Sequence, residues 1–132
     1  MKRSFVDSGV LIAAARGNSD RTERALSVLG EVDRIFISSV FVKLETLPKA
    51  ICYKQQPEVN FYKLFFEGVM HWATDLEVMT QSAYQLAYTY GLSGIDALHI
   101  AAAISLNADE FITTEKSTKP MYRVPNLHFV SI

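Results

Sequence analysis

The chain has 132 residues, of which 49% are hydrophobic and 20% charged, and its formal net charge is -1. This length and composition are typical of one globular domain with its own core, and they exclude an intrinsically disordered chain. The small net charge does not indicate a nucleic-acid partner, and any such partner would have to bind a local positive patch.

The cysteine content and the N-terminus indicate the compartment. Cys52 is the only cysteine, which excludes an internal disulfide and a CxxC metal pair and leaves an inert thiol. Lys2 and Arg3 precede an apolar run, as in a signal peptide, but Asp7 interrupts that run and the apolar part is too short. No stretch approaches the ~18–20 apolar residues of a membrane helix. We therefore expect a cytoplasmic protein with no membrane partner.

Short apolar strands and helices alternate along the chain. The pattern predicts strands at 3–7, 34–39, 71–75, 110–114 and 127–132, and helices at 8–17, 19–30, 39–55, 57–70, 76–91 and 95–106. Such alternation is typical of a parallel sheet with helices on both faces. We predict an α/β fold: a single three-layer α/β/α domain over residues 1–132 with a mainly parallel central sheet.

Four acidic residues fall where such a fold binds ligands. In open parallel sheets the ligand crevice lies outside the carboxyl ends of the strands. Asp7 ends the first strand and Glu115 follows the strand at 110–114. Asp96 opens a helix, and helices of right-handed crossovers begin near the same edge. Glu45 lies about two turns into the helix after 34–39. The four carboxylates are therefore expected at one edge.

Each acid also has a purely structural interpretation. Asp7 could cap the helix that follows it, and Asp96 fits a capping box with Ser93. Glu45 could pair with Lys49 one turn later. Glu115 lies in a polar loop, where a solvated charge is usual. The joint placement at one edge is what favours a common site.

A cluster of carboxylates needs compensation. Two of them ~4 Å apart repel by about 4 kcal/mol at an effective dielectric constant of 20. Several together either raise their pKa values or recruit a cation. Oxygen-only ligands suit Mg²⁺ or Mn²⁺ better than zinc, and such ions orient phosphates and activate water.

Four segments resemble the acidic motifs of PIN domains in order along nearly the whole chain. They are "FVDSGVLIAAARG", the Glu45 helix, "GLSGIDALHIAAA" and "FITTEK". PIN domains are metal-dependent ribonucleases, and stand-alone ones of this size are commonly VapC-type toxins of toxin–antitoxin pairs. The resemblance implies that Asp7, Glu45, Asp96 and Glu115 bind Mg²⁺ or Mn²⁺ and carry catalysis. It also implies an RNA substrate, a cognate antitoxin partner and a homodimer.

One position departs from the family pattern, because the last acid is usually Asp and is Glu115 here. The longer side chain can still reach a cation, directly or through water, so its role as a fourth ligand stays open. Hydroxyls beside the acids, on Ser8 and Thr113, match places where the family orients an acid or a bound water; turn and cap chemistry explains them equally well. For His99 we expect a histidine packed on a buried helix and hydrogen-bonded locally, although D-x-x-H could be metal spacing.

Basic and aromatic residues complete the predictions. Tyr62 and Phe66 are expected on a partner surface, with Phe61, Phe65 and Trp72 in the core. Five basic residues bracket two of the acids and are candidates to hold an RNA backbone, although a solvated face is the default for any one of them: Lys43, Lys49, Lys116, Lys119 and Arg123.

Two alternatives remain open from the sequence. The first is a catalytically inactive PIN-like module that binds RNA or protein, which the Glu at position 115 keeps in consideration. The second is a phosphoryl-transfer α/β domain with Asp7 as nucleophile or phospho-acceptor. The motif "VDSG" lacks a second acid two residues on, which weakens that alternative.

Overall fold

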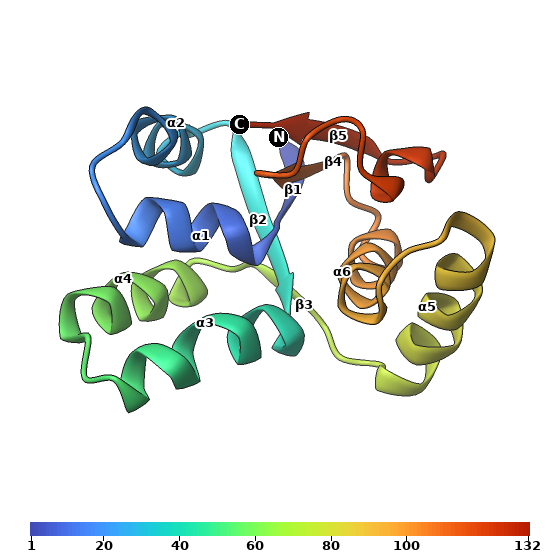
Figure 1. Cartoon of the computed structure of the whole chain (residues 1–132), viewed down its shortest axis with the longest axis horizontal. Coiled ribbons are helices and arrows are strands. Elements are labelled where there is room, and N and C mark those ends of the chain that lie inside the picture. The colour runs from blue at the N-terminus through green and yellow to red at the C-terminus, as the bar shows by residue number, and fades with distance from the viewer.

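A computed structural model describes all residues from 1 to 132 and contains one five-stranded parallel sheet (Figure 1). The strands lie in the order β3-β2-β1-β4-β5. They are β1 (Lys2–Val6), β2 (Arg34–Ser39), β3 (His71–Ala73), β4 (Glu110–Thr113) and β5 (His128–Ser131). The helices are α1 (Ser8–Ala15), α2 (Asp20–Leu29), α3 (Val40–Cys52), α4 (Gln56–Glu67), α5 (Leu76–Tyr90), α6 (Gly94–Ser105) and a 3-10 helix, η1 (Pro120–Arg123).

The predicted fold class is confirmed. Every predicted strand and helix is present, and their ends differ from the prediction by a few residues. The sheet is parallel throughout, whereas the prediction was of a mainly parallel one. The sequence analysis missed η1, because a single turn of four residues has too little periodicity to be recognised.

Local sequence signals explain where the helices begin and end. Side-chain oxygens of Asp7, Ser19, Asp75 and Ser93 accept backbone N–H groups at the starts of α1, α2, α5 and α6. Gly91 ends α5 in the left-handed region, with φ of 74°, a conformation that favours glycine. Most of these caps could be predicted from the sequence because they depend on residues only a few positions apart; the Asp75 cap was missed, because Asp75 was assigned to the preceding strand.

The helices cover the two faces of the sheet in unequal numbers. Figure 1 shows α1 to α4 on one side of the strands and α5 and α6 on the other. The rings of Phe5 and Phe111 stack in the core with centroids 5.3 Å apart. The buried face of α6 is rich in alanine, and these small side chains allow the helix to approach the sheet and α5 closely. None of the helices combines the length and the apolar character needed to cross a membrane.

The prediction that Tyr62 and Phe66 form a partner surface was wrong. Tyr62 and Phe66 are 0% and 6% exposed, so they belong to the core and present no partner surface. They lie on the inward face of α4, and the Tyr62 hydroxyl donates to Glu58 at 2.6 Å, which lets the ring be buried with its polar atom satisfied. Phe61, Phe65 and Trp72 are partly buried against the core, close to expectation.

The strand order determines where a ligand crevice lies. The chain runs outward from β1 to β2 and β3, and then crosses to the other side of β1 to form β4 and β5. In doubly wound sheets ligands bind where the direction reverses, outside the carboxyl ends of the strands. In this fold that point lies between the ends of β1 and β4, beside Asp7 and Thr113.

A buried ion pair stabilises the opposite, amino-terminal edge. Arg34 donates from Nε to Glu110 at 2.7 Å, and the Ser4 hydroxyl donates to the same carboxylate at 2.6 Å. Burial acts to raise the pKa of Glu110, but the hydrogen bonds from Arg34 and Ser4 outweigh it and hold that pKa below its usual range. Arg34 also pairs with the more exposed Glu31.

Glu110→Gln should lower the free energy of unfolding by about 3 kcal/mol at neutral pH, because it leaves the buried Arg34 without its main charge partner. Since the folded pKa of Glu110 is lowered, its contribution is complete above the ordinary carboxyl pKa of ~4.3 and is lost as pH falls through the folded pKa. The gap between wild type and variant should therefore narrow in acid. Urea unfolding at pH 7 and pH 3 measures it. Glu31→Gln is the control and should cost less than about 1 kcal/mol.

Candidate active site

Asp7 is the most buried of the four predicted acids. Its Oδ1 accepts the Ser8 N–H at 2.9 Å and its Oδ2 accepts the Thr113 hydroxyl at 3.0 Å. Burial raises the pKa of Asp7 above its ordinary value, and the charge of Asp96 acts in the same direction. The charge of His99 and the hydrogen bond from Thr113 act against this rise without cancelling it. Asp7 is thus a poorly compensated buried acid.

A close approach of α1 to the β4 end supports this arrangement. A Cβ added to Gly9 would lie 2.7 Å from the Thr114 hydroxyl oxygen. Glycine therefore lets the first turn of α1 lie beside the segment that follows β4. Asp7 and Thr113 are held within hydrogen-bonding distance by the same two segments.

Glu45 reaches the site from α3. Its Oε1 accepts the Ser8 hydroxyl at 2.7 Å and lies 2.5 Å from Nε2 of His99. The hydrogen bond with His99, followed by that from Ser8, holds the pKa of Glu45 below its ordinary value although partial burial acts to raise it. Glu45 makes no ion pair with Lys49, so the alternative interpretation of Glu45 as a surface partner of that lysine is wrong.

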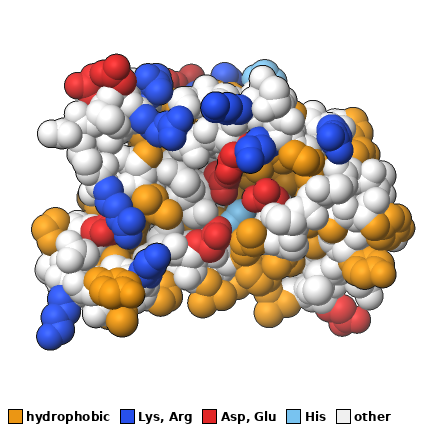
Figure 2. Space-filling view, viewed as in Figure 1, with side chains coloured by type: hydrophobic (Ala, Val, Ile, Leu, Met, Phe, Trp, Pro, Cys, Tyr) orange, Lys and Arg blue, Asp and Glu red, His pale blue; other side chains and the backbone are white.

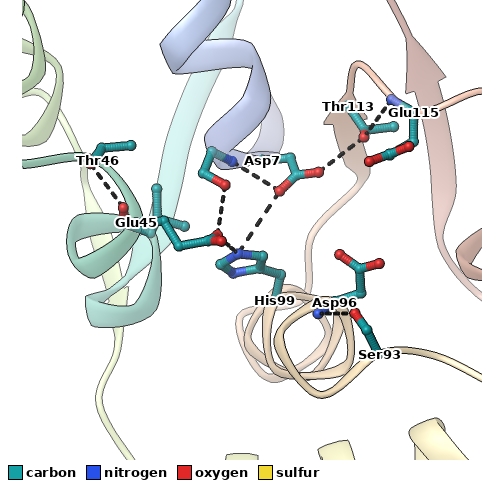
Figure 3. A network of polar contacts seen from close by, with 10 residues as sticks. Asp7, Glu45, Thr46, Ser93, Asp96, His99, Thr113 and Glu115 are labelled. Carbon is teal, nitrogen blue, oxygen red and sulfur yellow. Dashed lines mark hydrogen bonds and ion pairs between the residues drawn. The ribbon is translucent and has the colours of Figure 1, made fainter. Parts of the chain in front are cut away.

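Asp96 and Glu115 have fixed backbones and free carboxylates. The Asp96 N–H donates to Ser93 Oγ at 3.3 Å, which is the cap expected from the sequence. The Glu115 N–H donates to Thr113 Oγ1 at 3.1 Å, and its carbonyl accepts the Tyr122 hydroxyl at 3.0 Å. Figure 3 shows both side chains directed toward the space beside Asp7. Neither carboxylate forms a hydrogen bond or an ion pair, so both are available for a ligand.

The structure therefore brings the predicted site residues, which belong to α1, α3, α6 and the end of β4, to one edge of the sheet. Ser8 and Thr113 each bond an acid, Ser8 to Glu45 and Thr113 to Asp7. Figure 2 shows acidic side chains around a histidine in a hollow of this face, with basic side chains along one rim. The predicted RNA-binding residues are exposed: Lys43, Lys49, Lys116, Lys119 and Arg123.

Two of the basic residues have partners within the chain. Lys43 Nζ lies 4.6 Å from the centroid of the Trp72 ring, a cation–π contact. Arg123 donates to the carbonyl of Tyr90 at 3.2 Å.

The four carboxylates have the ligand chemistry that a hard cation prefers, but their oxygens are too far apart to hold one ion together. No three His, Cys, Asp or Glu side chains lie close enough to hold an ion together as they stand. Carboxylate oxygens are nevertheless the ligands that Mg²⁺ and Mn²⁺ take, and Asp7 is a buried acid whose charge lacks a full partner. Asp96 and Glu115 have no hydrogen bond or ion pair that would have to break before their carboxylates could bind an ion.

The family model of the PIN domain matches residues 4–125. The chain belongs to the PIN domain family. No curated protein sequence matches it significantly. The predicted resemblance to PIN domains is thereby confirmed over nearly the whole chain.

Solved structures share the fold at low sequence identity. VapBC2 from Rickettsia felis, bound to a DNA fragment from its promoter, is 18% identical with a TM-score of 0.73, and the match covers 98% of each chain. VapBC-1 from nontypeable Haemophilus influenzae is 19% identical with a TM-score of 0.69, over 98% of this chain and 97% of the other. VapC20 from Mycobacterium tuberculosis, a toxin that cleaves the sarcin-ricin loop, is 15% identical with a TM-score of 0.68, over 91% and 94%.

The sequence analysis missed the position of one residue in this PIN domain. His99 is buried, as expected, but its partner is Glu45 on another helix rather than a local group. Its Nε2 also lies 3.9 Å from Asp7 Oδ1. The spacing D-x-x-H was the only signal in the sequence, because it places His99 on the same face of α6 as Asp96.

Asp7→Asn should stabilise the fold at pH 7 in EDTA. A raised folded pKa means that ionisation of Asp7 disfavours the folded state as pH rises through that pKa, by ~1.4 kcal/mol for each tenfold difference in proton affinity between the folded and unfolded states. Asn keeps the helix cap, and the gain should vanish below the ordinary Asp pKa of ~3.9, where Asp7 is protonated in both states.

Thermal melts at pH 7 and pH 3.5 measure this difference. Asp75→Asn is the matched control, because Asp75 caps α5 at an exposed position and accepts the Val78 N–H at 3.1 Å. It should show no comparable gain at pH 7. An Asp7→Asn protein that melts below wild type at pH 7 in EDTA contradicts the raised pKa.

Proposed function

We propose that this PIN domain, over residues 1–132, is a metal-dependent endoribonuclease that acts as the toxin of a toxin–antitoxin pair in the cytoplasm. The observation that carries the proposal is the buried, poorly compensated carboxylate of Asp7 at the switch point of the sheet, with the unbonded carboxylates of Asp96 and Glu115 beside it. Buried acids with a perturbed pKa at such a crevice are typical of catalytic sites.

The neighbouring structures support the biological part of the proposal. Two of them are VapBC assemblies, and another is a toxin–antitoxin complex from Klebsiella pneumoniae, 19% identical with a TM-score of 0.70 over 97% of this chain and 96% of the other. A fourth is a toxin that cleaves the sarcin-ricin loop. We therefore propose a cognate antitoxin as the protein partner and RNA as the substrate.

In the proposed mechanism the chain provides a cation site and a surface for the strand. Asp7, Asp96 and Glu115 would bind Mg²⁺ or Mn²⁺, and Glu45 would contribute the oxygen that Ser8 and His99 leave free. The bound ion would supply charge neutralisation at the scissile phosphate and a lower pKa for an attacking water.

The other parts of the mechanism depend on the chain itself. Thr113 holds Asp7 in orientation through its hydroxyl, and a carboxylate of the cluster would position the attacking water or accept its proton. The exposed basic residues predicted from the sequence would hold phosphates without reading base sequence: Lys43, Lys49, Lys116, Lys119 and Arg123. Lys116 and Lys119 lie in the segment that follows Glu115.

Asp7→Asn and Asp96→Asn should each reduce cleavage of an RNA substrate by at least ~100-fold, because each removes a ligand charge, a loss larger than that of an outer partner. EDTA should abolish cleavage, and Mn²⁺ or Mg²⁺ should restore it. The measurement is single-turnover cleavage of labelled RNA, with Asp75→Asn as a control that should retain wild-type activity. Cleavage that persists in EDTA or in both variants rejects the nuclease assignment; tight RNA binding without cleavage favours the inactive binding module instead.

We also propose a homodimer, with an interface on α3 in place of the buried Tyr62 and Phe66. Val40, Leu44 and Ile51 are 41%, 62% and 54% exposed, and they recur every four and seven residues on one side of the helix. Leu47, which is partly buried, continues the same stripe. An apolar stripe of this spacing is suited to pairing with its own copy.

Leu44→Glu together with Ile51→Glu should convert the dimer to a monomer at micromolar concentration, because four carboxylates would be buried in the symmetric interface. Sedimentation velocity measures the change. Val32→Glu is the control, since Val32 is 89% exposed in a loop away from the stripe. A wild-type protein that sediments as a monomer contradicts the homodimer, and a dimer that survives both substitutions contradicts this interface.

A further inference from the structure

His99 lies inside the carboxylate cluster with almost no exposure to solvent. Its side chain is 2% exposed, and its ring packs beside Phe5 with centroids 6.1 Å apart. Nε2 lies 2.5 Å from Glu45 Oε1 and 3.9 Å from Asp7 Oδ1. Nδ1 is buried and has no hydrogen-bond partner.

The hydrogen-bond partners of the His99 ring show which of its nitrogens is protonated on the side of the carboxylates. An ionised carboxylate oxygen only accepts hydrogen bonds, so Nε2 is the donor to Glu45. The Ser8 hydroxyl donates to the same oxygen at 2.7 Å. Two donors therefore occupy the two acceptor directions of Oε1, and Oε2 is the Glu45 oxygen that stays free to bind a cation.

The buried position of His99 lowers the stability of the fold more than a side chain with only a packing role would. A buried ring nitrogen without a partner lowers stability, and an apolar side chain would avoid that loss. Glu45 is on a long side chain with several rotatable bonds, so holding it in one conformation before a ligand arrives removes an entropic cost of binding. The imidazole and the Ser8 hydroxyl are the two groups that hold it.

We propose that His99 is a positioning residue that, through Nε2–H, holds Glu45 with one defined oxygen open and so raises the affinity of the site for a divalent cation. The inference rests on the proposed function, in which that cation is the cofactor. His99 acts through Glu45 and does not bind the ion itself. Hydrogen-bond partners of a ligating carboxylate have this effect in metal sites, where their loss costs ~10–100-fold in affinity.

The test measures Mn²⁺ binding to the full chain without RNA, by the electron paramagnetic resonance signal of the free ion. His99→Gln and His99→Asn form a matched pair. Both are neutral amides, but the Gln side chain places its nitrogen near the position of Nε2, whereas Asn is too short to reach Glu45. The Kd of the Asn variant should rise by ~10–100-fold, and that of the Gln variant by less than ~10-fold.

Two further variants allow the test to be made even if the substitutions of His99 prevent folding. Ser8→Ala removes the second donor to the same oxygen and should also raise the Kd. Ile100→Val changes the buried neighbour of His99 on α6 by one methyl group and removes no polar atom, so it should leave the Kd unchanged. Thermal melts of every variant without Mn²⁺ record its stability. If neither His99 variant folds, the Ser8→Ala result decides: an unchanged Kd overturns the inference.

Three other results overturn it as well. An Asn variant that binds Mn²⁺ as tightly as wild type makes His99 a core histidine. A Gln variant as weak as the Asn variant makes the imidazole a direct ligand rather than a donor. Tighter binding in the Asn variant makes His99 a competitor of the cation. In all three cases wild type still binds Mn²⁺ and the proposed function stands. A wild-type protein that binds no Mn²⁺ contradicts both the role of His99 and the proposed metal-dependent function.

Discussion

A single buried carboxylate joins the elements of this PIN domain at their functional edge. Oδ1 of Asp7 accepts the N–H that begins α1, and Oδ2 accepts the hydroxyl at the end of β4. The two contacts tie together the ends of β1 and β4, where the direction of the sheet reverses. Burial raises the pKa of Asp7, so ionisation of this carboxyl group lowers the stability of the fold. Such a cost is common where a protein keeps a charge for binding or catalysis.

The opposite edge of the sheet shows how the same fold treats a carboxylate with a structural role. Glu110 is also buried, but it has Arg34 and Ser4 as direct donors, and its pKa is lowered. The guanidinium compensates the charge of Glu110, whereas Asp7 has only neutral donors and a histidine at 3.9 Å. The two acids differ in their partners, and this difference separates a buried ion pair from a candidate ligand.

The acids around Asp7 are held to different degrees. Glu45 is fixed by Ser8 and His99, while Asp96 and Glu115 have fixed backbones and unbonded carboxylates. The cluster therefore combines one carboxylate held by two hydrogen bonds with two carboxylates that have no partner in the chain. As the side chains stand, no three of them lie close enough to hold one ion together.

The sequence by itself determined the elements, most of the caps and the four acids, because these depend on periodicity and on neighbours a few residues away. It also carried the PIN motifs that identify the family. Only the tertiary structure decided that β1 lies between β2 and β4, which places Asp7 against Thr113, 106 residues later in the chain. It likewise decided that His99 meets Glu45 across 54 residues, and that Tyr62 and Phe66 face inward. Strand order and helix rotation are set by packing between distant segments, and no local pattern in the chain records them.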